Sequence, residues 1–221
     1  MAGARPGDSA AGQGRFPGFD VLDQARHWDS ATAAVVLART GPAPGIRFFT
    51  VVEQATATAL CDRLLGEQRL PDQGIEPLVP AANMIDARLA EAQTDGWRYQ
   101  DMPEDGQAWR DSLAALDADA TARFGGAFAS CSIDHQSTLI QAVQDRGPEP
   151  WHGMPAVHVW SLWTRYVCTA FYSHPAAWSE IGFPGPAYPC GYKNTGVDSR
   201  EPFEVRDAHP SEDPASGGAD R

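Results

Sequence analysis

The most informative stretch of the chain runs from Trp151 to Asn194 and reads WHGMPAVHVWSLWTRYVCTAFYSHPAAWSEIGFPGPAYPCGYKN. It contains four of the seven Trp, four of the five Tyr, three of the six His and two of the four Cys residues. Its first part has the apolar spacing of a helix, and its second part is a loop rich in Pro, Gly and aromatic residues. Rigid aromatic side chains at this density form either a hydrophobic core or a docking surface.

The length and charge of the chain limit what the protein can be. Its 221 residues suffice for one domain with a full core. Seventeen basic and twenty-nine acidic residues give a formal net charge of -12. Because Lys and Arg must neutralise phosphates, this balance argues against binding to nucleic acid and to anionic membrane surfaces. The chain has no run of eighteen apolar residues, so we expect no direct membrane span.

The amino-terminal sequence MAGARPGDSAAGQGRFPGF contains neither an apolar core nor an adjacent arginine pair. It therefore matches neither a general secretory leader nor a twin-arginine leader. We expect a cytoplasmic protein, which is periplasmic or membrane-associated only if a partner carries it. The four cysteines form no C-x-x-C motif, and we expect reduced thiols that are mostly buried, at Cys61, Cys131, Cys168 and Cys190.

Composition divides the chain into a middle domain and two ends. Residues 1–18 and the acidic residues 206–221 contain little that could be buried, so we expect both segments to be disordered. Residues 19–205 are expected to form a single helical domain.

Helix signals dominate this domain. Thr50 and Glu53 form a capping box that starts a helix ending at Gly66. Apolar periodicity and N-cap residues predict further helices over residues 81–93, 105–123, 132–145 and 155–172. A short helix is also expected around Phe128. The helix over residues 105–123 should turn four side chains inward, those of Trp109, Leu113, Leu116 and Ala120. Residues 31–39 fit a strand or a helix, and 203–205 resemble a strand. The sequence thus predicts an all-α fold, an irregular helical bundle with a long Pro/Gly/aromatic C-terminal loop.

Motifs that bind phosphate, activate a serine or bind zinc are absent from the sequence. The chain is therefore a poor candidate for a complete enzyme, and we predict no catalytic, cofactor-binding or metal-binding residues in it. His158 and Cys168 lie ten residues apart on one predicted helix, about 15 Å along its axis, which is too far to share an ion. Asp86, beside Arg88, and Glu53 are expected to cap helices and form ion pairs rather than to transfer protons.

Several short motifs resemble the gluconate 2-dehydrogenase subunit 3 family. They are F-F-T-x-x-E from Phe48 to Glu53, I-D-x-x-L from Ile85 to Leu89, and F-G-x-x-F from Phe124 to Phe128. A stretch ending in L-C-D-R-L-L at Leu65 and the residues Gln136, Leu139 and Ile140 also fit. The most specific motif is the terminal F-Y-S-H-P…W…I-G-F-P-G-P between Phe171 and Pro186.

The resemblance implies a small subunit that carries no cofactor of its own. Members of this family accompany an FAD-containing large subunit of the glucose–methanol–choline oxidoreductase class, often together with a multi-haem cytochrome c subunit. Such complexes oxidise gluconate, glucose, fructose, sorbitol or similar compounds. The small subunit is thought to help the large one fold and, in many members, to carry it out of the cytoplasm with a twin-arginine leader.

The aromatic stretch is the predicted partner interface. Prolines prevent the loop after Trp178 from folding back as a helix or a central strand, so one helix end does not cover all of its aromatic rings. Rigid aromatic anchors also lose little conformational entropy when they bind. The predicted interface residues are Trp151, His152, Tyr172, His174, Trp178, Phe183, Pro184, Tyr188 and Tyr192.

Two alternatives to a permanent accessory subunit remain open at this point. One is a free-standing helical enzyme that uses histidines with Glu180 as acid–base groups, the candidates being His152, His158 and His174. The other is a transient, chaperone-like module for a flavoprotein, with no place in the mature complex.

Overall fold

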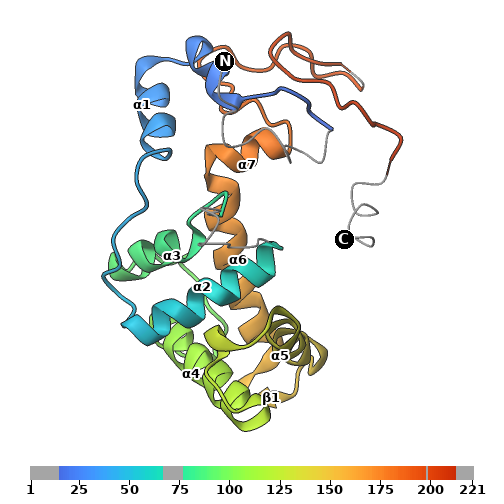
Figure 1. Ribbon diagram of the computed structural model, residues 1–221. Helices are drawn as coiled ribbons and strands as arrows, with labels where there is room; N and C mark the ends of the chain where they lie inside the picture. The colour runs from blue at the N-terminus through green and yellow to red at the C-terminus, as the bar shows by residue number, and fades with distance from the viewer. Residues whose placement is uncertain (1–14, 67–76, 198, 213–221) are drawn as a thin grey trace, which may run out of the picture. The chain divides into compact units, whose positions relative to one another are not determined.

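The computed structural model of the chain describes residues 15–66, 77–197 and 199–212. The chain divides into two compact units: unit 1 contains the described residues of Met1–Pro42 and Tyr172–Arg221, and unit 2 is Ala43–Phe171. The described elements are helical apart from one hairpin of two-residue strands, which confirms the predicted all-α fold (Figure 1). Residues 1–14 and 213–221 of the expected disordered ends lie outside the described residues. The predicted boundaries of the middle domain stay a prediction.

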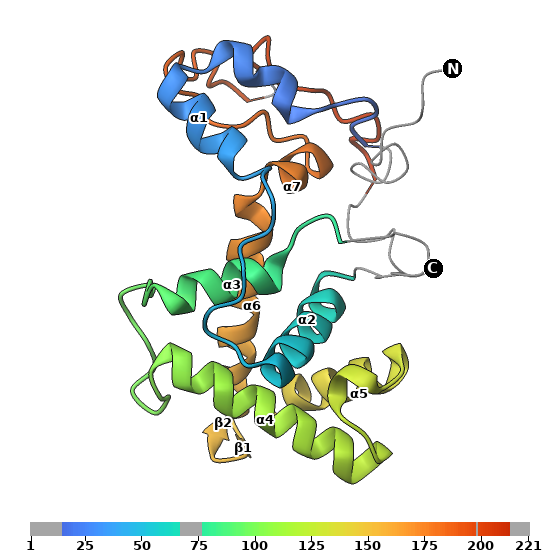
Figure 2. The ribbon, with the colours of Figure 1, turned by 60° about the vertical axis from the view of Figure 1, so that its left-hand side comes forward.

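Unit 2 contains the helices that the sequence predicted, with small shifts at their ends. The capping box is formed as expected, because Glu53 N donates to Thr50 Oγ1 and Thr50 N donates to the Glu53 carboxylate. Helix α2 contacts α3, α4 and α5 (Figure 2). The helical elements of unit 2 are α2 Val51–Leu65, α3 Ala81–Ala90, α4 Asp105–Phe124, η4 Phe128–Ser130, α5 Ile133–Asp145 and most of α6 Ala156–Ser173.

Aromatic side chains from α4 and α6 form the centre of the unit 2 core. Trp109 and Trp163 are fully buried, and the edge of one ring in the Trp109–Tyr166 pair meets the face of the other at 5.8 Å. Trp163 Nε1 donates to Ser112 Oγ over 3.0 Å, which satisfies a polar group that burial would otherwise leave unpaired. The other α4 residues predicted to face inward are also buried, so that prediction is confirmed for Leu113, Leu116 and Ala120.

A hairpin that the sequence did not predict precedes α6. Strands β1 Pro150–Trp151 and β2 Met154–Pro155 pair in antiparallel fashion, and the turn residue His152 has a positive φ of 47°. Asp119 on α4 accepts from Trp151 Nε1 at 2.8 Å and lies 2.7 Å from His152 Nε2. Strands of two residues leave no alternating pattern in a sequence, so the hairpin becomes evident only from its backbone pairing in the fold.

Unit 1 consists of η2 Val21–His27, α1 Ser30–Ala38, α7 Pro175–Glu180 and loops. The structure resolves the ambiguity at residues 31–39 in favour of a helix, whose N-cap Asp29 accepts from Thr32 N at 2.6 Å. Residues 203–205, which resembled a strand, are not in a strand. The sequence did not predict helix α7, because a proline after a helix is typical of the end of the helix. Pro175 instead occupies the first turn of a new helix, where a missing N–H costs nothing.

The expectation that the cysteines are mostly buried is wrong. Cys61 is buried, Cys131 is half-buried, and Cys168 and Cys190 are exposed. Cys168 lies on the outer side of α6 and Cys190 on the loop after α7, where no packed layer covers either thiol.

Candidate partner-binding surface

The predicted interface residues separate into buried and exposed groups. Trp151 and Trp178 are only 2% and 6% exposed, and Pro184 is also buried, so these side chains belong to the cores of their units in this conformation. His174 and Phe183 are half-buried. The remaining predicted residues are exposed, namely His152, Tyr172, Tyr188 and Tyr192. The interface itself stays a prediction.

Trp178 is the centre of the small core of unit 1. It packs with Val21 and Val36, and its ring meets that of Phe183 edge-on at 5.4 Å. Its Nε1 donates to the carbonyl oxygen of Tyr172 over 2.7 Å. The two valines come from the N-terminal part of the chain, more than a hundred residues away in sequence, so the pattern around Trp178 gave no sign of them.

Two glycines of the I-G-F-P-G-P motif are explained by close ring contacts. Gly182 and Gly185 have φ of 67° and 85°, which side-chain-bearing residues rarely adopt. A Cβ atom on Gly182 would lie 2.4 Å from Phe16 Cε1, and one on Gly185 would lie 2.4 Å from Trp28 Cζ2. The motif therefore needs glycine both for its backbone conformation and for the approach of two aromatic rings.

The exposed tyrosines lie on a loop that is held in place beyond α7. Tyr188 and Tyr192 are 65% and 49% exposed. The carboxylate of Glu201 accepts from the backbone N–H groups of Lys193 and Asn194, and the hydrogen bond from Asn194 lowers the pKa of Glu201 most strongly. This clamp fixes the backbone directly after Tyr192, so the loop presents its aromatic rings from a restrained backbone.

His174 acts as the N-cap of α7. Its Nδ1 accepts from Ala176 N at 3.2 Å, a role that requires the neutral imidazole. Burial lowers the pKa of His174 from its ordinary value of 6.5; a hydrogen bond with the Arg39 backbone opposes this, and the Arg39 charge adds to it. The folded chain therefore keeps His174 neutral to a lower pH than the unfolded chain does.

We expect the stability of unit 1 to fall as the pH drops below about 6.5, because the unfolded chain then binds a proton that the folded chain does not. The loss should level off below the folded-state pKa. Amide hydrogen exchange of α7 between pH 7.5 and 5 measures it. His174→Asn supplies a cap that does not titrate and should remove part of the pH dependence. Equal pH profiles for the two proteins would contradict the assignment.

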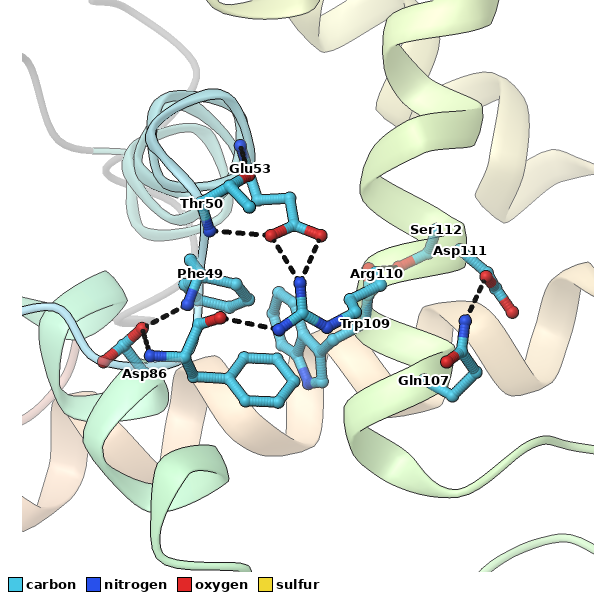
Figure 3. Close-up of polar contacts among 10 residues, drawn as sticks. Phe49, Thr50, Glu53, Asp86, Gln107, Trp109, Arg110, Asp111 and Ser112 are labelled. Carbon is cyan, nitrogen blue, oxygen red and sulfur yellow. Dashed lines mark hydrogen bonds and ion pairs between the residues drawn. The ribbon is translucent and has the colours of Figure 1, made fainter.

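In unit 2, the carboxylates considered as acid–base groups hold the chain ahead of α2 (Figure 3). Asp86 is fully buried and accepts from the backbone N–H groups of Arg47, Phe48 and Phe49 at 2.6, 2.9 and 2.7 Å. Arg110 also binds the backbone here, because its guanidinium donates a hydrogen bond to the carbonyl oxygen of Phe48 over 2.7 Å. Asp86 was expected to cap a helix and form an ion pair; it instead lies buried on α3 and accepts from three backbone N–H groups of the segment ahead of α2.

Glu53 combines the capping box with an ion pair between helices. Arg110 Nη1 lies 2.7 and 2.8 Å from the two carboxylate oxygens of Glu53 (Figure 3). Burial raises the pKa of Glu53, but hydrogen bonds from Thr50 and Arg110 and the Arg110 charge outweigh it and lower that pKa. The predicted capping and ion pairing of Glu53 are confirmed.

A second charged cluster surrounds Tyr166. The guanidinium of Arg88 pairs with Asp95 and lies 4.6 Å from the centre of the Tyr166 ring. Arg165 pairs with Asp95 at 3.0 Å and packs over Trp97. Burial, followed by the hydrogen bond that Tyr166 donates to Asp105 over 2.7 Å, raises the pKa of Tyr166.

The histidines proposed for the alternative, catalytic interpretation have separate partners. In unit 2, His152 pairs with Asp119, whereas His158 stacks on Tyr99 and pairs with Asp101 at 2.9 Å. Among the described residues, no three His, Cys, Asp or Glu side chains are grouped so that they could hold a metal ion. Within the same residues, no helix is both long enough and apolar enough to cross a membrane.

The fold and surface described above define a small helical protein that presents aromatic side chains on a proline-rich loop. A family model described as gluconate 2-dehydrogenase subunit 3 matches residues 52–185, from α2 through the I-G-F-P-G segment. The chain belongs to the gluconate 2-dehydrogenase subunit 3 family, which confirms the resemblance drawn from its motifs. No curated protein and no solved structure matched the chain.

Proposed function

We propose that the chain is a non-catalytic accessory subunit that binds and supports an FAD-dependent dehydrogenase of the glucose–methanol–choline class. The substrate of the complex would be a sugar, a sugar acid or a polyol, bound and oxidised by the flavoprotein. Membership of the subunit 3 family is the observation that carries this proposal. This chain would hold no cofactor, and the FAD would belong to the partner.

The exposed tyrosines beyond α7 are the proposed anchors for the flavoprotein. Tyr188 and Tyr192 are large, have few rotatable bonds, and stand on backbone restrained by Glu201 and three prolines. A side chain that is already restrained loses little entropy on binding, so more of its contact energy appears as affinity. Tyr172, at the end of α6, is the third exposed tyrosine of the predicted interface in unit 1.

A cytochrome c subunit as a further partner is also part of the proposal, since flavoproteins of this class pass electrons onward. We propose the cytoplasm as the place where the chain meets its flavoprotein, and any later location would be set by the partner.

Size-exclusion chromatography of the co-expressed pair separates a permanent subunit from a transient chaperone-like module, because only the permanent subunit elutes with the flavoprotein.

Purification of the tagged chain provides the first test. Alone, it should show no flavin absorbance and no dehydrogenase activity, whereas the co-purified complex should show both. With the recovered flavoprotein as the titrant, Tyr188→Ser combined with Tyr192→Ser should raise the Kd about thirtyfold or more, because truncating even one aromatic anchor commonly costs about 2 kcal/mol.

Tyr99→Ser is the matched control for that double variant, because it removes an exposed tyrosine from unit 2. It should leave the Kd nearly unchanged. Dehydrogenase activity in the isolated chain would refute the accessory role. An unaltered Kd in the double variant would instead refute the tyrosine anchors while leaving the accessory role standing.

A further inference from the structure

The N-terminal residues 16–28, called the strap below, lie against α7 and the loop that follows it. Phe16 contacts the backbone at Gly182, and Trp28 contacts it at Gly185. Between these two rings, Val21 is 1% exposed, packs with Trp178, and donates its backbone N–H to Ser179 Oγ over 3.1 Å. The strap therefore binds this surface through two rings, one apolar side chain and a hydrogen bond.

The surface under the strap consists of residues that the sequence predicted as partner-binding. Trp178, Phe183 and Pro184 are buried or half-buried, and Trp178 and Phe183 pack in the same small core as Val21, Phe19 and Trp28. Without these strap residues, the ring of Trp178 and the backbone at Gly182 and Gly185 would form an exposed apolar patch. Patches of that kind mark sites of protein interaction.

The strap lies outside the region that the family model matches, whereas its binding surface lies almost entirely inside that region. The family model covers residues 52–185, which include α7, Gly182 and Gly185 but not the strap. A segment outside the family region thus covers a surface whose most specific motif lies inside that region.

Packing along the outer side of the strap is incomplete. A surface pocket of about 240 Å³, open to solvent, lies between strap residues that include Phe19 and Gln24 and the segment from Pro202 to Val205. A smaller cavity of about 40 Å³ separates Gln24 and Trp28 from Pro184 and Pro186. Gln24 Oε1 is buried and has no hydrogen-bond partner in the part of the chain that the structure describes. The unpaired Gln24 oxygen weakens the hold on the strap, because a buried acceptor without a donor costs free energy.

We propose that the strap is an intramolecular occupant of a docking surface formed by α7 and residues 181–187, and that the flavoprotein and the strap bind this surface in competition. The identity of the competing partner rests on the proposed function above. In the free subunit the strap keeps the apolar surface away from solvent. Because the partner can bind only molecules in which the strap has been released, the bound strap lowers the apparent affinity for the partner in proportion to that open fraction.

A peptide supplied in trans tests the docking surface without any partner protein. The probe is a labelled synthetic peptide of residues 15–29, titrated into the full chain and into a full chain carrying Phe16→Ser and Trp28→Ser. The peptide should bind the variant at least tenfold more tightly than the wild type, whose surface is occupied. The same peptide with both rings replaced by serine should not bind. Equal binding to both chains, or binding to neither, overturns the proposal.

A glycine pair tests the same contact in case the double variant does not fold. Gly185→Ala places a Cβ against Trp28, whereas Gly191→Ala adds the same Cβ at a similar φ of 68° where nothing lies within 4 Å. Both substitutions strain the backbone, and only the first expels a ring. Amide exchange in residues 16–28 should therefore accelerate at least tenfold in Gly185→Ala and little in Gly191→Ala. Equal exchange rates in the two variants overturn the assignment of the strap.

Competition with the partner is measured by titrating the recovered flavoprotein. The Phe16→Ser, Trp28→Ser chain should bind it severalfold more tightly than the wild type does, and the 15–29 peptide should displace it. Unchanged or weaker binding overturns the competition. If no flavoprotein binds the wild-type chain, the proposed function fails, while the peptide titration still decides whether the docking surface exists.

Discussion

Replacing Asp86 with alanine is expected to lower the free energy of unfolding of unit 2 by about 3 to 5 kcal/mol. The fully buried carboxylate accepts three consecutive backbone N–H groups, at Arg47, Phe48 and Phe49. Alanine would leave these donors without an acceptor, and an unpaired buried donor costs about 1–3 kcal/mol. The same bonds fix Phe49 in the core directly ahead of the α2 capping box, so the loss should extend to the start of that helix.

Urea unfolding, followed by the helical circular dichroism signal at about 222 nm, measures the change in the free energy of unfolding by linear extrapolation to zero denaturant. Asp111→Ala is the control, because Asp111 is an exposed α4 carboxylate that accepts from Gln107 (Figure 3). It should alter the stability by no more than about 0.5 kcal/mol. Asp86→Asn keeps one acceptor oxygen and should fall between the two. Equal effects of Asp86→Ala and Asp111→Ala would contradict the structural role of the carboxylate.

The helices of unit 2 were predictable because their signals are local. The Thr50–Glu53 capping box and the spacing of Trp109, Leu113 and Leu116 lie within a few turns of the elements they define. Such patterns determine where a helix starts and which of its faces is buried, without knowledge of the neighbouring elements. Several of the family motifs lie on or next to these same helices, whereas the most specific one lies on α7 and the loop after it.

What the sequence did not reveal depends on contacts between distant residues. Asp86 binds backbone groups that precede it by 37 to 39 positions, and Asp119 orders a hairpin 32 residues further along. Neither carboxylate differs in its local sequence from a surface aspartate. The expected capping and ion pairing hold for Glu53, whose capping partner is local, whereas the roles of Asp86 and Asp119 depend on the fold.

The aromatic C-terminal stretch combines both possibilities that its composition allowed. Trp151 and Trp178 are core residues, whereas Tyr188 and Tyr192 are exposed, and the sequence offered no rule that separates them. The separation follows from residues elsewhere in the chain that cover the tryptophans, such as Val21 in unit 1. Val21 and Val36, more than a hundred residues away in the sequence, thus turn a predicted surface residue, Trp178, into a core residue.

Trp178→Ala is therefore expected to destabilise unit 1 by about 3 to 5 kcal/mol, the usual cost of truncating a buried tryptophan. The variant loses contacts with Val21 and Val36 and the hydrogen bond to the Tyr172 carbonyl oxygen. Amide exchange should accelerate in η2, α1 and α7 and remain slow in α4, because the core of α4 belongs to unit 2.

Tyr188→Ala is the control that separates folding from docking. Tyr188 is 65% exposed, so its truncation should leave the exchange of unit 1 nearly unchanged while weakening the binding of the flavoprotein. Any loss of binding in Trp178→Ala would then reflect the unfolding of the docking unit as well as a lost contact. If Trp178→Ala leaves exchange in unit 1 as slow as in the wild type, the ring is not a core residue in solution, and the original assignment of Trp178 as a surface anchor regains its basis.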